Sequence, residues 1–232
     1  LEACWRVNPR LYRFIYCSSQ AAAGPADGPE PIDESCPPHP ISHYGHSKLA
    51  AEEAVRSYAD RMPVVILRPA AAYGPRERDI LTFFRLVKRG LKLIPGGGTR
   101  QVSLIYVGDL VELALRALQE ERAVGQTYFA CDGVPYDWER TMDTLAEVLG
   151  KRTLRIVVPM PLLEAVAAVG GMWARLWRKP FLLNDQKVLE MKERYWLCDA
   201  GKACRELGFV PQVDLKTGFA RTARWYQEHG WL

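Results

Sequence analysis

The feature that most constrains the fold is an uninterrupted apolar run, Val-Val-Ile-Leu at positions 64–67. In a strand that faces water on one side, apolar and polar residues alternate along the chain. A run without such alternation is typical of a strand that is buried on both faces, as in a parallel sheet covered by helices. The run therefore indicates a buried parallel strand.

The segments on either side of this run alternate between strand-like and helix-like patterns. Strands are predicted over residues 12–18, 64–67, 102–107 and 126–130, and helices over residues 44–61, 80–89, 109–121 and 137–149. Asp109 is the predicted N-cap of its helix, and residues 21–40, rich in proline and glycine, are predicted to be a loop. The alternation predicts an α/β fold whose parallel sheet is covered on both faces.

Beyond Gly133 the sequence becomes mostly helical. A short strand is predicted over residues 155–158, and helices are predicted over residues 161–177, 185–192, 200–207 and 215–227. The helix over residues 161–177 is apolar, but it is too short and too often interrupted to span a bilayer. We interpret it as a core or lid helix, and a helix lying on a membrane surface or lining an apolar pocket is the alternative.

Composition argues against several kinds of partner. Hydrophobic residues make up 48% and charged residues 25% of the chain, which is ordinary for a globular protein. The net charge of +4 comes without a dense stripe of lysine and arginine, so nucleic acid is not an expected partner. The most basic stretch, residues 76–92, is interpreted as a solvated helix face, with attraction for an anionic substrate as the alternative. No transmembrane segment is predicted.

The six cysteines, at positions 4, 17, 36, 131, 198 and 204, form no C-x-x-C pair and show no metal-ligand spacing. The sequence therefore predicts no metal site. Reduced thiols in a cytoplasmic protein are the simplest interpretation of this pattern.

Tyr44 and Lys48 bring a phenol and an ammonium group together. They are four residues apart in a predicted helix, so their side chains project from the same face, one turn apart. A nearby positive charge favours the phenolate form of a tyrosine, and such a tyrosine can exchange a proton with a substrate oxygen near neutral pH. Ser18 ends the strand predicted over residues 12–18 and Ser19 follows it, and Ser19 is expected to hydrogen-bond the same oxygen.

These residues resemble the extended short-chain dehydrogenase/reductase family, which includes NAD-dependent epimerases and dehydratases and 3β-hydroxysteroid-dehydrogenase-like enzymes. The resemblance rests on the paired serines, on Tyr-x-x-x-Lys, and on segments 64–75, 104–110, 207–211 and 218–226 in the family's order. It implies a Rossmann-like parallel sheet, N-terminally incomplete, with a smaller, mostly helical C-terminal substrate domain. Residues 1–75 and 103–132 would be part of the dinucleotide-binding domain, and residues 76–102 and 133–232 would be the substrate-binding region.

The resemblance also implies an activity. The protein would be an NAD(P)-dependent oxidoreductase or epimerase acting on a secondary alcohol or ketone, such as a nucleotide sugar or a steroid-like molecule, with NAD or NADP as the cofactor. Ser19, Tyr44 and Lys48 would be the catalytic residues, and Tyr44 and Lys48 would also contact the cofactor. Ser19 is chosen over Ser18 because the family's serine or threonine directly follows another small polar residue, and Ser18 would face the backbone. Pro69 and Ala71 would pack near the nicotinamide.

Further residues would meet the substrate. The resemblance places Gln20, Arg76 and Arg100 on the substrate side, and the substrate is expected to be a small molecule. It also implies a homodimer that forms through two helices flanking the sheet, one of which bears Tyr44 and Lys48. Ordinary packing of that helix on the sheet is the alternative.

One element of the family is missing from the sequence. No G-x-G-x-x-G or G-x-x-G-x-x-G occurs, and the nearest run, glycines 96–98, precedes a predicted strand and is therefore interpreted as a turn. We expect the chain to lack the first part of the domain, roughly a hundred residues, and so to be inactive by itself. The alternative is a non-catalytic NAD(P)-binding or scaffolding module that retains the fold.

Overall fold

The computed structural model describes residues 1–8, 10–177 and 185–232, and for residues 171–177 only the course of the helix. The described residues form two compact units. The first consists of Leu1–Ala72, Ser103–Pro135 and Trp196–Val213. The second consists of Tyr73–Val102, Tyr136–Tyr195 and Asp214–Leu232.

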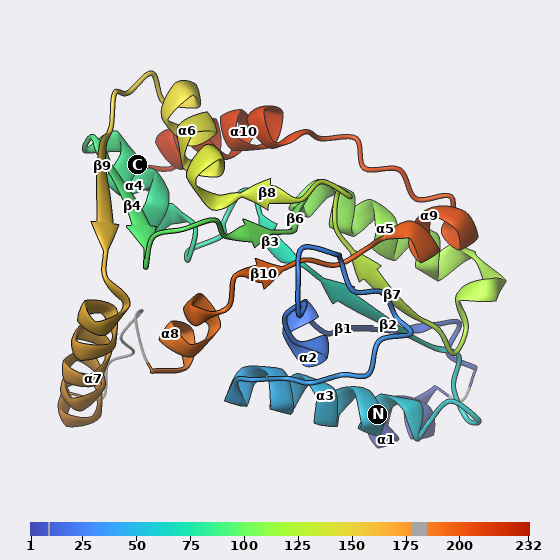
Figure 1. Cartoon of the computed structure of the whole chain (residues 1–232). Helices are drawn as coiled ribbons and strands as arrows, with labels where there is room; N and C mark the ends of the chain where they lie inside the picture. Colours follow the sequence, from blue (N-terminus) through green and yellow to red (C-terminus); the bar gives the residue numbers. More distant parts are fainter. Residues whose placement is uncertain (9, 178–184) are drawn as a thin grey trace. The chain divides into compact units, whose positions relative to one another are not determined.

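The first unit is built on a parallel sheet with the strand order β1-β2-β7 (Figure 1). Its strands are β1 (Phe14–Cys17), β2 (Val64–Pro69) and β7 (Thr127–Ala130). Every residue of β2 is buried, because this strand lies between its two neighbours with helices above and below. The interpretation of the apolar run as a buried parallel strand is therefore confirmed.

Alternate residues of β2 enter two hydrophobic cores, since successive side chains of a strand point to opposite faces. Val65 and Leu67 lie in a core with α5 (Val107–Gln119) and α9 (Gly201–Leu207). Val64 and Ile66 pack instead with residues of α1 (Glu2–Val7) and α3 (His43–Arg56), and Figure 1 shows α3 along this face. The predicted cover on both faces of the sheet is thus present.

The division into units departs from the expected one at Trp196–Val213, which was assigned to the substrate-binding region but belongs to the first unit. The reason is the packing of α9. Ala203 and Leu207 are buried in the core beneath the sheet. The backbone amide of Val213 then donates a hydrogen bond of 3.1 Å to the carboxylate of Asp109 on α5.

That contact also corrects the role predicted for Asp109. Helix α5 begins at Val107 with Tyr106 as its N-cap, so Asp109 lies inside the first turn and is not the cap. Its carboxylate is buried and accepts from the Val213 amide, a partner 104 residues away in sequence. A contact of this range leaves no local signal.

Two further local predictions were wrong. The segment predicted as a loop over residues 21–40 begins inside a short helix, α2 (Gln20–Ala23), whose alanines favour helix and whose N-cap is Ser19. The strand predicted over residues 102–107 is divided at Ser103 into β5 (Gln101–Val102) and β6 (Leu104–Tyr106). Strand β6 pairs with β3 (Ala71–Tyr73), which the sequence did not predict.

The second unit contains a parallel pair, β4 (Leu91–Pro95) and β9 (Leu154–Val158). The helices α4 (Leu81–Lys88), α6 (Trp138–Val148) and α10 (Leu215–Glu228) pack beside this pair or beside one another. Strand β5 pairs antiparallel with β8 (Tyr136–Asp137), and β10 (Tyr195–Trp196) completes that sheet. The unit expected to be mostly helical therefore also holds several strands.

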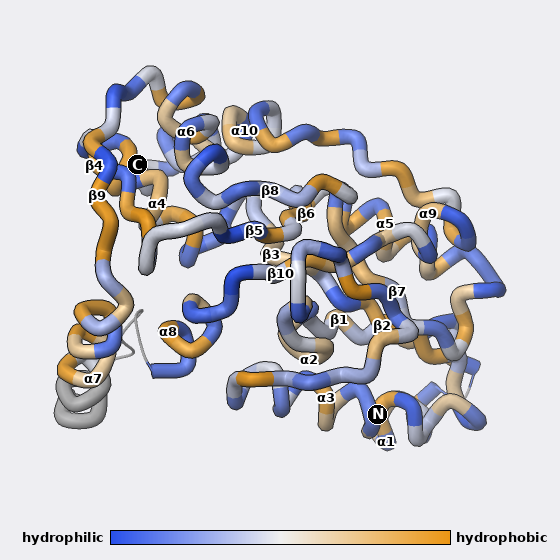
Figure 2. Tube along the Cα trace, viewed as in Figure 1, coloured by the Kyte–Doolittle hydropathy of each residue, from blue (hydrophilic) through white to orange (hydrophobic). Residues whose placement is uncertain are grey.

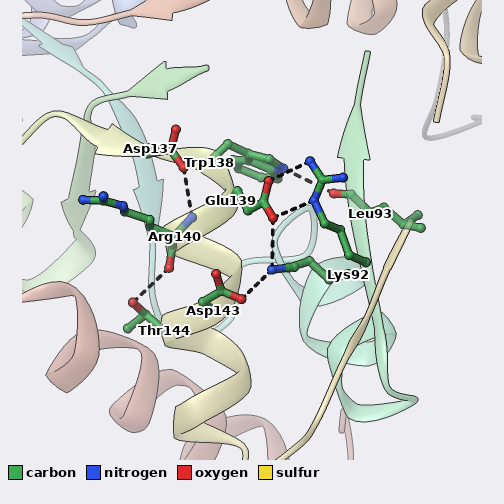
Figure 3. A network of polar contacts seen from close by, with 9 residues as sticks. Lys92, Leu93, Asp137, Trp138, Glu139, Arg140, Asp143 and Thr144 are labelled. Carbon is green, nitrogen blue, oxygen red and sulfur yellow. Dashed lines mark hydrogen bonds and ion pairs between the residues drawn. The ribbon is translucent and has the colours of Figure 1, made fainter. Parts of the chain in front are cut away.

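Strand β4 was not predicted because Lys92 interrupts the apolar pattern of its residues. In the structure this lysine is nevertheless buried. Its ammonium lies 2.6 Å from a carboxylate oxygen of Asp143 and 3.4 Å from one of Glu139, both on α6 (Figure 3). Arg155 of β9 contacts Glu139 at 2.7 Å. Burial opposes the charge of Lys92, but the two carboxylates outweigh this effect and raise the pKa of Lys92. The network joins β4, β9 and α6.

Helix α7 (Met160–Trp177) precedes α8 (Asp185–Lys192). Leu162, Val166 and Val169 are exposed along its first half, and Figure 2 shows the apolar character of this part. These side chains do not support the interpretation as a core helix, and the later side chains of α7 lie outside the described residues. In the part of the chain that the structure describes, none of the helices has the length and apolar character needed to cross a membrane.

Candidate active site

Ser19 lies where β1 gives way to α2. Its hydroxyl oxygen accepts a hydrogen bond of 3.2 Å from the Ala21 amide and so caps the helix. A serine hydroxyl has one hydrogen to donate and two lone pairs, so this cap leaves the hydrogen of Ser19 available. The position follows the carboxyl end of a parallel strand, which is where open α/β sheets bind their ligands.

Tyr44 and Lys48 lie in the first turns of α3, where Ser42 caps the helix by accepting from the Gly45 amide at 3.1 Å. The ammonium nitrogen of Lys48 is 5.7 Å from the centre of the Tyr44 ring, so the two side chains share one face as their spacing predicts. Tyr44 is 50% exposed. Its hydroxyl makes no hydrogen bond within the described residues.

Lys48 is held at the end of β1. Its ammonium group donates to the Cys17 carbonyl oxygen at 3.0 Å and lies 5.3 Å from the centre of the Tyr16 ring. Cys17 is two residues before Ser19, so this contact brings the helix that bears Tyr44 to the strand end that bears the serine. The three predicted catalytic residues therefore meet in one region of the first unit.

Gly45, which was not among the predicted site residues, permits this arrangement. A Cβ atom at this position would lie 2.3 Å from the carbonyl oxygen of Ala21, which is too close for any other residue. The first turn of α3 therefore packs directly on α2, the helix capped by Ser19. The signal was the glycine that directly follows Tyr44.

Ser18 differs from its predicted position. It was expected to face the backbone, but its buried hydroxyl donates to the carboxylate of Glu52 at 2.6 Å. The reason is strand geometry, because neighbouring residues of an extended chain point to opposite sides. Ser18 consequently points into the protein while Ser19 begins α2.

The predicted nicotinamide-side residues follow the neighbouring strand. Pro69 ends β2, and Ala71 begins β3 and is exposed. Because Cys17 pairs with Leu67 in the parallel register, Ser19 and Pro69 follow at the same carboxyl edge of the sheet. Gln20 is only 4% exposed, and its amide nitrogen is buried without a hydrogen-bond partner in the described structure. A buried donor of this kind is rare and calls for a ligand or a bound water.

The other two predicted substrate residues belong to the second unit. Arg76 is exposed and has a backbone φ of 72°, in the left-handed region that residues other than glycine rarely adopt. Arg100 donates to the Pro95 carbonyl at 2.9 Å and to the carbonyl of Glu193 at 2.9 Å. Glu193 is the residue that directly follows α8. Its role toward a substrate stays a prediction.

The interpretation of glycines 96–98 as a turn agrees with the structure, since all three have positive φ and strand β5 follows them. Among the described residues, we find no group of three or more His, Cys, Asp or Glu side chains that could hold a metal ion. The six cysteines are present as free thiols.

Comparison with known proteins gives the class of the chain. Residues 1–131 match the model of the NAD dependent epimerase/dehydratase family. Among curated proteins, the chain is 30% identical to human dTDP-D-glucose 4,6-dehydratase, with 96% of this chain and 59% of that protein covered. It is 29% identical to the ceramide reductase of Caulobacter vibrioides, with 95% and 64% covered. The solved UDP-glucose 4-epimerase of Thermotoga maritima has the same fold, with a TM-score of 0.77, 22% identity, and 98% and 67% covered.

The chain belongs to the NAD dependent epimerase/dehydratase family. The predicted family and the Rossmann-like α/β fold are thereby confirmed, as is the dependence of the family on a nicotinamide cofactor. The first curated relatives are longer, and the chain spans 57%, 64% and 59% of their lengths.

Proposed function

We propose that the protein containing this chain transfers hydride between a nicotinamide cofactor and a secondary alcohol or ketone of a nucleotide sugar. The observation that supports it is the position of Lys48, which lies against Tyr44 and is fixed to the end of β1 beside Ser19. The names of two of the relatives, a dTDP-D-glucose dehydratase and a UDP-glucose epimerase, point to the same substrate class.

In the proposed reaction, Tyr44 exchanges a proton with the reacting oxygen of the substrate. Lys48 favours the phenolate by its charge, and the free hydrogen of Ser19 donates to the same oxygen and orients it. The bound cofactor supplies the hydride chemistry. Release of the ketone makes the enzyme a dehydrogenase, whereas return of the hydride to the other face of the carbon makes it an epimerase.

Two features of the first unit fit a flat, polar cofactor or substrate at this edge of the sheet. Ala71 is small and exposed after β2, so a ring can approach the backbone there. The unpartnered amide of Gln20, buried beside Ser19, offers a donor that a ligand oxygen would satisfy. Lys48 and Tyr44 would hold the nicotinamide side, and Pro69 would border it.

The test uses substrates deuterated at the carbinol carbon. The natural full-length protein is incubated with NAD or NADP and with a panel of nucleotide sugars, hydroxysteroids and a ceramide. Mass spectrometry then follows the deuterium. We expect it to move to the cofactor or to return to the epimerised carbon of a nucleotide sugar. Cofactor binding without deuterium transfer from any substrate would instead support the non-catalytic binding or scaffolding module.

Arg76 provides a prediction that separates function from stability. A non-glycine residue in the left-handed region costs about 1–2 kcal/mol, and such strain is often kept at functional sites. In the Arg76→Gly variant we expect the free energy of unfolding to stay constant or to rise by up to about 1 kcal/mol. We expect KM for a nucleotide diphosphate substrate to rise about tenfold, because the charge that would bind the phosphates is lost.

Arg78→Ala is the matched control. It removes the same charge two residues away, from a side chain that lies 5.6 Å from the centre of the Trp231 ring. Urea unfolding and initial rates are measured for both variants. An unchanged KM in Arg76→Gly, or an equal rise in both variants, would remove the specific role of Arg76.

We also propose that the protein forms a homodimer through α3. Ala50 and Ala54 are exposed on this helix, and such small side chains permit close helix packing. Sedimentation of Ala50→Glu compared with the unmodified protein tests this, because a buried charge at the contact would dissociate the dimer.

A further inference from the structure

A buried carboxylate lies one helical turn beyond Lys48. Glu52 on α3 has no exposed surface, and burying an ionised carboxylate is costly unless it is paired and hydrogen-bonded. Its oxygens accept from the Ser18 hydroxyl at 2.6 Å and from two nitrogens of Arg68, Nε at 2.9 Å and Nη2 at 2.8 Å. The charge is therefore fully compensated inside the protein.

The three residues come from three elements of the first unit. Ser18 directly precedes Ser19 at the end of β1, and Arg68 directly precedes Pro69 in β2. Glu52 is on the same helix as Tyr44 and Lys48. One carboxylate thus joins the helix to both strand ends at the level of the candidate active site.

The donors around this carboxylate favour its ionised form. Burial opposes its charge, but the hydrogen bonds from Arg68 and Ser18 outweigh burial and lower the pKa of Glu52. The ion pair with Arg68 is a two-point contact, which fixes the direction of both side chains as well as their distance. Arg56, one turn further along α3, reaches Glu52 at 2.8 Å with a side chain that is 43% exposed.

We propose that Ser18, Glu52 and Arg68 are positioning residues that hold Tyr44 and Lys48 in place against Ser19. This inference rests on the proposed function of those three residues. The Lys48 contact to Cys17 fixes only the first turns of α3, whereas the Glu52 contacts fix the helix further along and prevent it from rotating over the sheet. Misplacement of reacting groups by about 1 Å can cost about 10²-fold in rate.

Ser18→Ala tests the inference in the natural full-length protein. It removes one hydroxyl and leaves Glu52 paired with Arg68, so the protein is expected to fold. We expect kcat to fall at least about tenfold while KM for the substrate changes less than about twofold, because Arg76 and Arg100, the arginines proposed to bind the substrate, lie outside the cluster.

Arg56→Gln is the control. Arg56 pairs with Glu52 on the same helix, and its hydrogen bond to the sheet, which it donates to the Thr127 hydroxyl, is long at 3.3 Å and exposed to solvent. The kcat of this variant is expected to stay within about twofold.

A second variant separates positioning from stability. In Ser18→Ala/Glu52→Leu/Arg68→Met, apolar residues replace the whole cluster, and such replacements are often neutral or stabilising. We expect unfolding in urea to resemble that of the unmodified protein while kcat stays at least about tenfold lower. Recovery of kcat together with stability would show that the cluster has a structural role alone.

Hydrogen exchange provides a readout that needs no substrate. Ser18→Ala is expected to raise hydrogen exchange of the amides of residues 21–24 at least about tenfold. These amides are in or next to α2, which begins just after Ser18 and packs against the first turn of α3 at Gly45, so loosening of α3 exposes them. Arg56→Gln is expected to leave their exchange unchanged. Tyr44→Phe in the same rate assay reports on the proposed function separately. If Tyr44→Phe stays active, the proposed function is wrong, and hydrogen exchange alone then tests whether Ser18, Glu52 and Arg68 hold these elements in place. Unchanged kcat and unchanged exchange in Ser18→Ala would overturn the inference.

Discussion

Replacing Tyr44 with phenylalanine is expected to lower kcat by about 10²–10⁴-fold, which is the range that a positioned acid or base contributes. The substitution removes one oxygen from a side chain that is half exposed, so the fold should be unaffected. The ring that faces Lys48 is kept, and cofactor affinity should change little. Initial rates and cofactor titrations in the natural full-length protein provide the measurement.

Tyr16→Phe is the matched control for this prediction. The Tyr16 ring also lies near the Lys48 ammonium, at 5.3 Å compared with 5.7 Å for Tyr44, and both variants lose only a hydroxyl. We expect Tyr16→Phe to keep its rate within about twofold. Equal losses in the two variants, or full activity in Tyr44→Phe, would contradict the assignment of Tyr44 as the acid/base.

Replacing Arg68 with leucine is expected to give the largest loss of stability, about 3–5 kcal/mol in the free energy of unfolding at neutral pH. The variant leaves Glu52 buried with only the Ser18 hydroxyl and the partly exposed Arg56 as partners. Arg56→Gln should cost less than about 1 kcal/mol, because its side chain is 43% exposed and solvent screens the pair. Urea unfolding at several pH values measures both.

The pH dependence has a definite sign. In the unmodified protein the pKa of Glu52 is lower in the folded than in the unfolded state, so its stabilising contribution is complete at neutral pH and is lost as the pH falls through the folded value. Without Arg68, burial should raise the folded pKa, and the carboxyl group should take up a proton in mild acid. The difference in the free energy of unfolding between Arg68→Leu and the unmodified protein should therefore become smaller as the pH falls from 7.5 to 5. A difference that grows in acid would refute this explanation.

Sequence reasoning worked where the information is local. The apolar run at 64–67 required a buried strand, and the i, i+4 spacing of Tyr44 and Lys48 placed both side chains on one helix face. The two serines were noticed because they follow a strand-like run, and the choice of Ser19 between them came from the family resemblance; its catalytic role stays a prediction. The same local reasoning missed β4, because the buried Lys92 breaks the apolar pattern and is compensated only by carboxylates on α6.

Contacts between residues distant in sequence could not be predicted. Ser18 and Glu52 are 34 positions apart, and Glu52 and Arg68 are 16 apart, so only the folded sheet brings them together. A glutamate in a helix with several alanines and other charged residues is expected to be a surface residue. The same limit applied to Asp109, whose partner Val213 is supplied by a segment near the end of the chain.

The two serines that follow β1 have different roles: Ser18 points inward and contacts Glu52, and Ser19 caps α2. Their order along the chain determines which serine takes each role. Deleting one residue from β1, or inserting one, would exchange the inward and outward positions of the strand. The hydroxyl that meets Glu52 would then turn toward the ligand side, and its neighbour would turn inward. Length changes in this strand should therefore be far more damaging than exchanging either serine for another small residue, and natural variants of this protein should keep the strand at constant length.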